Sequence, residues 1–375
     1  MSWLSEALAA LDESGLRRHL RHRSERAGRR FDGLVNFSSN DYLGLAGDPR
    51  IADAAADAAT RWGAGAGASR LVTGGTSLHR ELERALSDWK GSEDAVVFSS
   101  GYLANTGTIA ALVGPEDAVF SDELNHASIV DGCRLSRAVV RVFAHRDLSM
   151  LGRQLAATPA RRRLIVTDGV FSMDGDAADL PALAALAHSY DAMLMVDDAH
   201  GCGVVGPGGR GTAAAQDDAA VDVTVGTLSK AFGSAGGYVT GSAELCEWLR
   251  NRARGFVFDT ALPPPAAGAA LEALRISEVE PSRRETAIRH ARTLARGLGT
   301  AAPAACVVPL IVGDAARAVA ASAALAEAGL HVVAIRPPSV PPGTARLRFA
   351  TTAAHEPADI ELAIAAAGDI LAPTR

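Results

Sequence analysis

The chain has 375 residues, of which 48% are hydrophobic and 21% are charged, and its formal net charge is −6. This is the composition of an ordinary globular protein, and the length suffices for two or three domains with substantial cores. The negative net charge argues against general nucleic-acid binding. The most apolar helix-like stretch, 315–330, contains Arg317 and Glu327 and falls short of the roughly 18 apolar residues that a membrane span requires. We therefore expect no membrane partner.

The four cysteines are widely spaced and form no CxxC pair. This spacing disfavours both a disulfide framework and a zinc site, and it indicates a reducing cytoplasm as the compartment. Residues 1–13 carry acidic side chains and no apolar core before a cleavage site, which argues against a signal peptide. His19 and His22 lie one helical turn apart, but the arginines around them would repel a cation, so we expect no metal.

The chain begins with an N-terminal arm that we expect to be helical, followed by the segment 36–45. The part of the arm from Arg17 to Arg30 contains seven arginines. One interpretation is a solvated amphipathic helix. The other is an anion site, because clustered guanidiniums bind the phosphates of coenzyme A, an acidic carrier protein or a substrate carboxylate.

Short strand-like runs then alternate with helix-like segments. This alternation predicts an α/β fold with a mainly parallel sheet, because parallel neighbours need a crossover connection. The expected strands are 95–98, 118–120, 139–143, 164–167, 193–197, 222–226 and 237–240.

The pattern changes after the proline run 263–265, which no helix interior or central strand would tolerate. A long helical stretch follows, then strands at 307–312, 331–335 and 345–350 with helices at 314–328 and 357–371, which together indicate a smaller α+β domain. We therefore expect an N-terminal arm at 1–45, a large α/β domain at 46–262 and a small C-terminal domain at 263–375.

Two motifs in the large domain carry the chemistry. Asp197 and His200 follow a buried strand, where α/β proteins place their functional groups, and Lys230 follows another strand between small, uncharged residues. Each residue alone has an ordinary explanation, as a turn cap, a loop histidine or a solvated lysine. Together they match what pyridoxal phosphate needs: a lysine for the Schiff base, an acid for the ring nitrogen and a hydrogen-bond partner for the phenolic oxygen.

A phosphate site is expected at Ser99-Ser100-Gly101-Tyr102-Leu103-Ala104-Asn105, which follows one strand and opens a helix. A helix start offers unpaired N–H donors and a positive dipole end, and glycine lets the backbone come close. Tyr102 then borders the ring or belongs to a capping turn. His126 opens the next helix, where it stacks on a flat cofactor or is structural.

Two glycine-rich segments, 63–68 and 206–211, imitate a dinucleotide-binding fingerprint. The first follows a helical pattern, and the second carries Pro207 where the turn should enter a helix. Both lack the strand-turn-helix context, so a nicotinamide cofactor is disfavoured.

The chain resembles the α-oxoamine synthases, fold type I pyridoxal-phosphate enzymes, over essentially its whole length. The motifs that carry the resemblance are Asn36-Phe37-Ser38-Ser39-Asn40-Asp41-Tyr42-Leu43-Gly44-Leu45, Asp168-Gly169-Val170-Phe171-Ser172-Met173-Asp174-Gly175-Asp176, Asp197-Asp198-Ala199-His200-Gly201, Thr227-Leu228-Ser229-Lys230 and Ile335-Arg336-Pro337-Pro338-Ser339-Val340-Pro341.

The resemblance implies a role for each matching residue. Lys230 would carry the cofactor, Asp197 would pair with the ring nitrogen, His200 would contact the phenolic oxygen and His126 would stack on the ring. The remaining cofactor contacts would come from Ser172, Thr227, the amides of Gly101 and Tyr102, and, from the partner subunit, Thr260. The residues implied for substrate binding are Asn40 and Arg336 for the amino-acid carboxylate, Arg21 near the acyl group, and Ser339, which stands where threonine is frequent.

The last of these motifs is most like that of the biotin-pathway member of the family. The resemblance therefore implies a homodimer that condenses L-alanine with a pimeloyl thioester, delivered by coenzyme A or acyl carrier protein. Asp168 departs from the glutamate that is frequent at this position. Two alternatives remain: the sister reaction of glycine with acetyl-CoA, and a non-catalytic partner subunit, which Lys230 disfavours because such a protein would be expected to lack this lysine.

Overall fold

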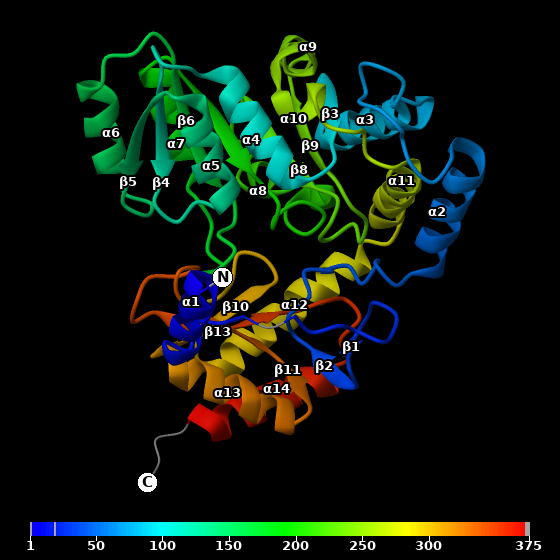
Figure 1. Cartoon of the computed structure of the whole chain (residues 1–375), viewed down its shortest axis with the longest axis vertical. Coiled ribbons are helices and arrows are strands. Elements are labelled where there is room, and N and C mark those ends of the chain that lie inside the picture. The colour runs from blue at the N-terminus through cyan, green and yellow to red at the C-terminus, as the bar shows by residue number, and fades with distance from the viewer. Residues whose placement is uncertain (1, 19, 372–375) are drawn as a thin grey trace. The chain divides into compact units, whose positions relative to one another are not determined.

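The computed structural model describes residues 2–18 and 20–371 (Figure 1). The chain divides into two compact units. Unit 1 comprises 1–42, 173–175 and 286–375, and unit 2 comprises 43–172 and 176–285. The domain ranges drawn from the sequence, 1–45, 46–262 and 263–375, stay a prediction.

Unit 2 contains a seven-stranded sheet in the order β3-β9-β8-β7-β6-β4-β5. The neighbouring strands β8 and β7, β7 and β6, β6 and β4, and β4 and β5 pair in parallel. Strand β9 runs antiparallel to both β8 and β3. The bounds are β3 Asp94–Phe98, β4 Ala118–Asp122, β5 Val139–Phe143, β6 Arg163–Asp168, β7 Ala192–Asp197, β8 Val223–Thr227 and β9 Gly237–Gly241. The mainly parallel sheet confirms the predicted α/β fold class.

Helices cover both faces of this sheet, so its central strands are buried and mainly apolar up to the polar residues at their carboxyl ends. In β4, for example, Val119 packs into one core cluster while Ala118 and Phe120 pack into another on the opposite face. The helices of unit 2 are α2 Pro49–Trp62, α3 Ser77–Lys90, α4 Gly101–Leu112, α5 Ala127–Ser136, α6 Leu148–Ala157, α7 Leu180–Ser189, the short α8 Thr212–Ala215, α9 Ala243–Arg252, α10 Arg254–Val257 and α11 Pro264–Val279, with a 3₁₀ turn at Pro207–Gly209.

Unit 1 contains two three-stranded sheets, β10-β13-β12 and β1-β2-β11. Their bounds are β10 Val307–Gly313, β12 Val333–Ile335, β13 Ala345–Ala350, β1 Arg30–Phe31, β2 Leu34–Asn36 and β11 Leu330–His331. Its helices are α1 Ser2–Glu13, α13 Ala315–Glu327, α14 Pro357–Leu371 and the part of α12 (Ser282–Leu298) from residue 286 onward.

The prediction of a single strand at 331–335 is wrong in one respect, because the structure divides this segment between two sheets. His331 pairs in parallel with Asn36 of β2, whereas Val333 pairs with Arg348 of β13. Val332 lies buried between the two pairings. A run of β-branched residues reports that a segment is extended but not which sheet it joins.

The expectation of a helical arm is also wrong for its arginine-rich part. Helix α1 ends at Glu13, and Gly15 takes a positive φ of 64° while the N–H of Arg17 donates to the carbonyl of Leu11. Residues 17, 18 and 20–29 form no helix. Arginines spaced three or four residues apart repel one another on a helix face, which disfavours continuation of the helix beyond this glycine turn.

Within residues 2–18 and 20–371, no helix is both long and apolar enough to cross a membrane. The same part of the chain holds no group of three or more histidine, cysteine or acidic side chains placed to bind a metal ion. His19, weighed above as a metal ligand, lies outside the described residues.

Candidate active site

A cavity of about 170 Å³ opens at the carboxyl ends of the unit 2 strands. This edge is where parallel sheets place their ligands, because each strand there gives way to a loop or a helix start. Asp168, Asp197 and Thr227 are the last residues of β6, β7 and β8. Eight of the residues predicted from the sequence line this cavity, namely Gly101, Tyr102, His126, Ser172, Asp197, His200, Thr227 and Lys230.

The carboxylate of Asp197 is buried and held in one orientation. Its Oδ2 accepts a hydrogen bond of 2.6 Å from the side-chain amide of Asn105, and its Oδ1 accepts one of 2.9 Å from the backbone N–H of Ala199. Only 5% of the residue is exposed. An acid fixed in this way presents a defined oxygen to a cationic ligand group.

A chain of hydrogen bonds connects Asp197 to His126. The Nδ2 of Asn105 also donates to Ser128 Oγ at 2.9 Å, and that hydroxyl lies 2.7 Å from Nδ1 of His126. The imidazole of His126 stands exposed at the rim of the cavity. This chain therefore couples the orientation of a ring at the rim to the orientation of the buried acid.

Asn105 and Ser128 were missed as site residues. Asn105 ends the predicted phosphate motif, but Thr106 and Thr108 are also polar and buried in the same helix, so no local signal distinguishes it. Its Oδ1 is buried and has no hydrogen-bond partner in the described part of the chain. A buried amide oxygen without a partner costs free energy unless a ligand or water completes it.

Asp168 lies directly beside Asp197 in the sheet register. Its Oδ2 accepts from the backbone N–H of His126 at 2.8 Å, and its own N–H donates to Asn125 Oδ1 at 2.8 Å. Burial, followed by the nearby charge of Asp197, raises the pKa of Asp168 well above its usual value. Asp168 thus lines the cavity as an acid that resists ionisation and fixes the start of α5.

The start of α4 provides the anion-binding end of the cavity. Ser100 caps this helix by accepting from the N–H of Leu103 at 3.1 Å. A Cβ at Gly237 would lie 2.5 Å from the backbone N of Gly101, so only glycine in β9 lets the helix start pack this closely against the sheet. The hydroxyls of Thr227 and Ser229 lie 2.7 Å apart beside it, also lining the cavity.

A buried ion pair holds the loop that carries His200. Lys90 Nζ lies 3.3 Å from Asp198 Oδ2, and the same carboxylate accepts from the N–H of Thr212. The side chains of Lys90 and Asp198 are 7% and 2% exposed. This pair is not predictable from local sequence, because Lys90 lies more than a hundred positions before its partner.

The other predicted residues lie elsewhere. Thr260 is exposed and outside the cavity lining, and its backbone carbonyl accepts from Ser99 Oγ at 2.9 Å. In unit 1, Arg21, Arg336 and Ser339 line a second cavity, of about 720 Å³, together with Arg17 and Arg18.

The remaining substrate residues of unit 1 have partners within that unit. Asn40 is absent from the lining of the second cavity, and its Oδ1 accepts from Tyr42 Oη and Arg348 Nη2, each at 3.1 Å. Arg336 donates to the backbone carbonyls of Gly15 and Arg17, so it is engaged with the arm in this structure.

Residues 32–366 match the aminotransferase class I and II family. The chain belongs to this family. Among its relatives, 8-amino-7-oxononanoate synthase from Anaeromyxobacter dehalogenans is 53% identical, with 99% of this chain and 96% of the relative covered. The protein of the same name from Maricaulis maris is 51% identical, with 94% and 92% covered.

Solved structures agree with this family membership. A serine palmitoyltransferase from S. paucimobilis with bound PLP–myriocin aldimine superposes with a TM-score of 0.91 at 33% identity, covering 98% of this chain and 96% of that one. An 8-amino-7-oxononanoate synthase from Francisella tularensis superposes with a TM-score of 0.77 at 26% identity, covering 90% and 98%. Within the class I and II family the chain is an α-oxoamine synthase, as its motifs indicated, and its cofactor is pyridoxal 5′-phosphate (PLP).

The residues of the unit 2 cavity fit PLP. A helix start with two hydroxyls beside it suits a phosphate dianion. Asp197 suits a cationic ring nitrogen, and Lys230, half-buried in the same lining, supplies an amine. Asn105, whose amide orients Asp197, lines the same cavity.

Proposed function

We propose that this α-oxoamine synthase condenses L-alanine with a pimeloyl thioester to give 8-amino-7-oxononanoate, a step of biotin biosynthesis, releasing carbon dioxide and the free thiol. The observation that carries the proposal is the identity of 49 to 54% to proteins named for this product, over 94 to 99% of the chain. The gathering of Lys230, Asp197 and His200 around one cavity supports a working catalyst over a non-catalytic partner subunit.

Each cavity residue has a definite task in this proposal. PLP, when bound, supplies an electron-withdrawing ring that stabilises negative charge at Cα of the amino acid. Asp197 keeps the ring nitrogen protonated, since an ion pair at about 4 Å in a partly screened site is worth roughly 4 kcal/mol. The amine of Lys230 would hold the cofactor and, when it is not bonded to it, would take the Cα proton of the amino acid as general base.

The remaining cavity residues orient the cofactor. His126 would stack on the ring, His200 would contact the phenolic oxygen, and Ser172 would lie near the cofactor. The α4 start at Gly101 and Tyr102, with the Thr227 hydroxyl, would bind the phosphate. Asp168 accepts from the N–H of His126, and burial followed by the charge of Asp197 raises its pKa, which disfavours a second negative charge beside Asp197.

Substrate recognition falls to residues of unit 1. Arg336 and Asn40 bind the amino-acid carboxylate, Ser339 contributes a hydroxyl to substrate binding, and Arg21 binds near the acyl group. Arg336 donates to the backbone carbonyls of Gly15 and Arg17, and its guanidinium has further N–H donors that a carboxylate can use.

The protein works, in this proposal, as a homodimer in the cytoplasm. Phe258 and Thr260 are exposed, which supports the proposal that this segment reaches the phosphate of the partner subunit. All four cysteines are buried and unpaired, which supports a reducing compartment.

The test is mass spectrometry of the product formed by the purified protein from alanine or glycine with pimeloyl-CoA, pimeloyl-acyl carrier protein or acetyl-CoA. The mass of 8-amino-7-oxononanoate from alanine with either pimeloyl thioester is the expected result, and the comparison of the two identifies the carrier. Efficient turnover of glycine with acetyl-CoA alone would assign the sister reaction instead.

A further inference from the structure

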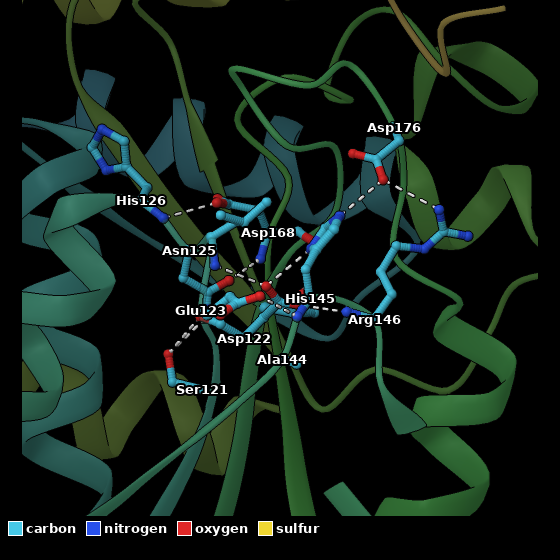
Figure 2. Close-up of polar contacts among 12 residues, drawn as sticks. Ser121, Asp122, Glu123, Asn125, His126, Ala144, His145, Arg146, Asp168 and Asp176 are labelled. Atoms are coloured by element: carbon cyan, nitrogen blue, oxygen red, sulfur yellow. Dashed lines mark hydrogen bonds and ion pairs between the residues drawn. The ribbon is translucent and has the colours of Figure 1, made fainter. Parts of the chain in front are cut away.

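A histidine outside the cavity lies between two carboxylates (Figure 2). Nδ1 of His145 is 3.1 Å from Asp122 Oδ1, and Nε2 is 2.9 Å from Asp176 Oδ2. The backbone N–H of His145 donates to Glu123 at 2.8 Å. The next residue, Arg146, donates to Asp176 through its guanidinium at 3.2 Å and to Asp122 through its backbone N–H at 2.9 Å.

This geometry requires a charged imidazole. A neutral histidine has one N–H donor, whereas both ring nitrogens here face carboxylates that accept hydrogen bonds. Burial by itself lowers the pKa of His145, but the hydrogen bonds and charges of Asp122 and Asp176 outweigh burial and raise the pKa to about 9. The residue is thus an imidazolium at neutral pH.

One of the two carboxylates shapes the turn that leads to His126. Asp122 is the last residue of β4, and its Oδ1 accepts from the N–H of Leu124 at 2.9 Å while its backbone carbonyl accepts from the N–H of Asn125. His126 follows and caps α5. The position of this turn therefore depends on the Asp122 carboxylate that His145 holds.

The other carboxylate lies beside the residues that carry Ser172. The backbone carbonyl of Asp176 accepts from the N–H of Phe171 at 2.9 Å. The ring of Phe171 packs edge-on against the ring of His145, with centroids 4.4 Å apart and planes at 87°. Ser172, which lines the cavity, is the next residue in the chain.

We propose that His145 is a positioning residue for the cofactor site. Its imidazolium connects the β4–α5 turn, which carries His126, with the segment from Phe171 to Asp176, which carries Ser172. Through this connection it governs how tightly the cavity holds PLP. The inference rests on the proposed roles of His126 and Ser172. It does not depend on which acyl substrate the enzyme uses.

The charged groups that face His145 are Asp122 and Glu123 at the end of β4, Arg146 next in the chain, and Asp176 after β6. Carboxylates and guanidiniums keep their charge between pH 7 and 10. A change in this cluster over that range therefore comes from deprotonation of His145, which removes one of the two ring donors.

The experiment measures the dissociation constant of PLP by absorbance titration of the apoprotein between pH 7 and 10, for the wild type and for His145→Gln. Glutamine retains a hydrogen-bonding side chain but cannot carry the charge. His188→Gln, an exposed histidine on α7, is the matched control. Since the variant loses hydrogen bonds that the charged imidazole donates to two carboxylates, we expect His145→Gln to weaken PLP binding about tenfold at pH 7.5, and the control to leave it unchanged.

The pH dependence separates positioning from a general loss of structure. The ratio of the two dissociation constants should fall toward one as pH rises through about 9, where the wild type loses the same charge. Asp176→Asn removes one of the two carboxylates, so PLP binding should weaken at a lower pH than in the wild type. This variant replaces His145→Gln in the experiment if His145→Gln does not fold. A ratio that stays constant from pH 7 to 10, or equal affinities at pH 7.5, would overturn the proposal. Failure of the wild type to bind PLP would instead contradict the cofactor assignment, and an unexpected product would contradict the proposed reaction alone.

Discussion

The side-chain amide of Asn105 donates to Oδ2 of Asp197 at 2.6 Å and, with the same nitrogen, to Ser128 Oγ at 2.9 Å. Helix α4 thereby controls the acid at the end of β7. One buried amide thus orients the partner of the ring nitrogen and, through Ser128, the imidazole of His126.

Replacing this amide should slow proton abstraction without removing the cofactor. Asn105→Ala loses a hydrogen bond to a charged group, worth about 1.5 to 3 kcal/mol, so the rate of Cα deprotonation should fall roughly 10- to 100-fold. Stopped-flow absorbance with alanine measures that rate. Asn251→Ala, on the exposed face of α9, is the control and should react normally. An unchanged rate for Asn105→Ala would mean that Asp197 is oriented by Ala199 alone.

Asp197→Asn should have a larger effect than Asn105→Ala, because an amide carbonyl cannot hold the ring nitrogen protonated. We expect retained PLP and a Cα deprotonation rate lower by a factor on the order of 10³, since most of roughly 4 kcal/mol is lost. The same stopped-flow assay checks it. A near-normal rate would show that Asp197 is structural.

Arg21→Ala should weaken the thioester more than alanine. Arg21 lines the unit 1 cavity with other arginines, and loss of a charge-assisted contact costs about 1.5 to 3 kcal/mol, which predicts a KM for the pimeloyl thioester raised about 10- to 100-fold. The KM for alanine should change little. Equal effects on both KM values would point to a structural role of the arm.

The ion cluster of His145 should also affect stability with a definite sign. The pKa of His145 is raised to about 9, above its unfolded value of about 6.5, so its contribution is fully present below pH 6.5 and is lost as pH rises through 9. Thermal unfolding of the wild type and His145→Gln should differ by roughly 5 °C at pH 6 and converge above pH 9. A gap that widens with pH would contradict the assigned charge state.

The sequence predicted the part of the site that lies in strand ends. Asp197, His200 and Lys230 follow apolar runs that predict buried strands, and parallel strands bring their carboxyl ends together. Asn105 and Lys90 were beyond sequence reasoning because their partners, Asp197 and Asp198, lie about a hundred positions away and only the folded sheet brings them into contact.

Two local predictions about the fold were wrong for similar reasons. The sequence predicts a helix through the arginine-rich arm, but α1 ends at Glu13 and the turn at Gly15 precedes the first of these arginines. The run 331–335 was expected to be one strand, but its halves pair with β2 and β13. In both places the decisive information is a backbone turn or a choice of neighbour, which residue periodicity does not encode.

The central claim, that the unit 2 cavity holds PLP on Lys230, is tested most directly by borohydride reduction of the purified protein followed by peptide mass mapping. We expect a yellow protein whose visible band disappears on reduction, with a pyridoxyl label on the peptide that contains Lys230. A label on another lysine, or no chromophore after incubation with PLP, would contradict the account.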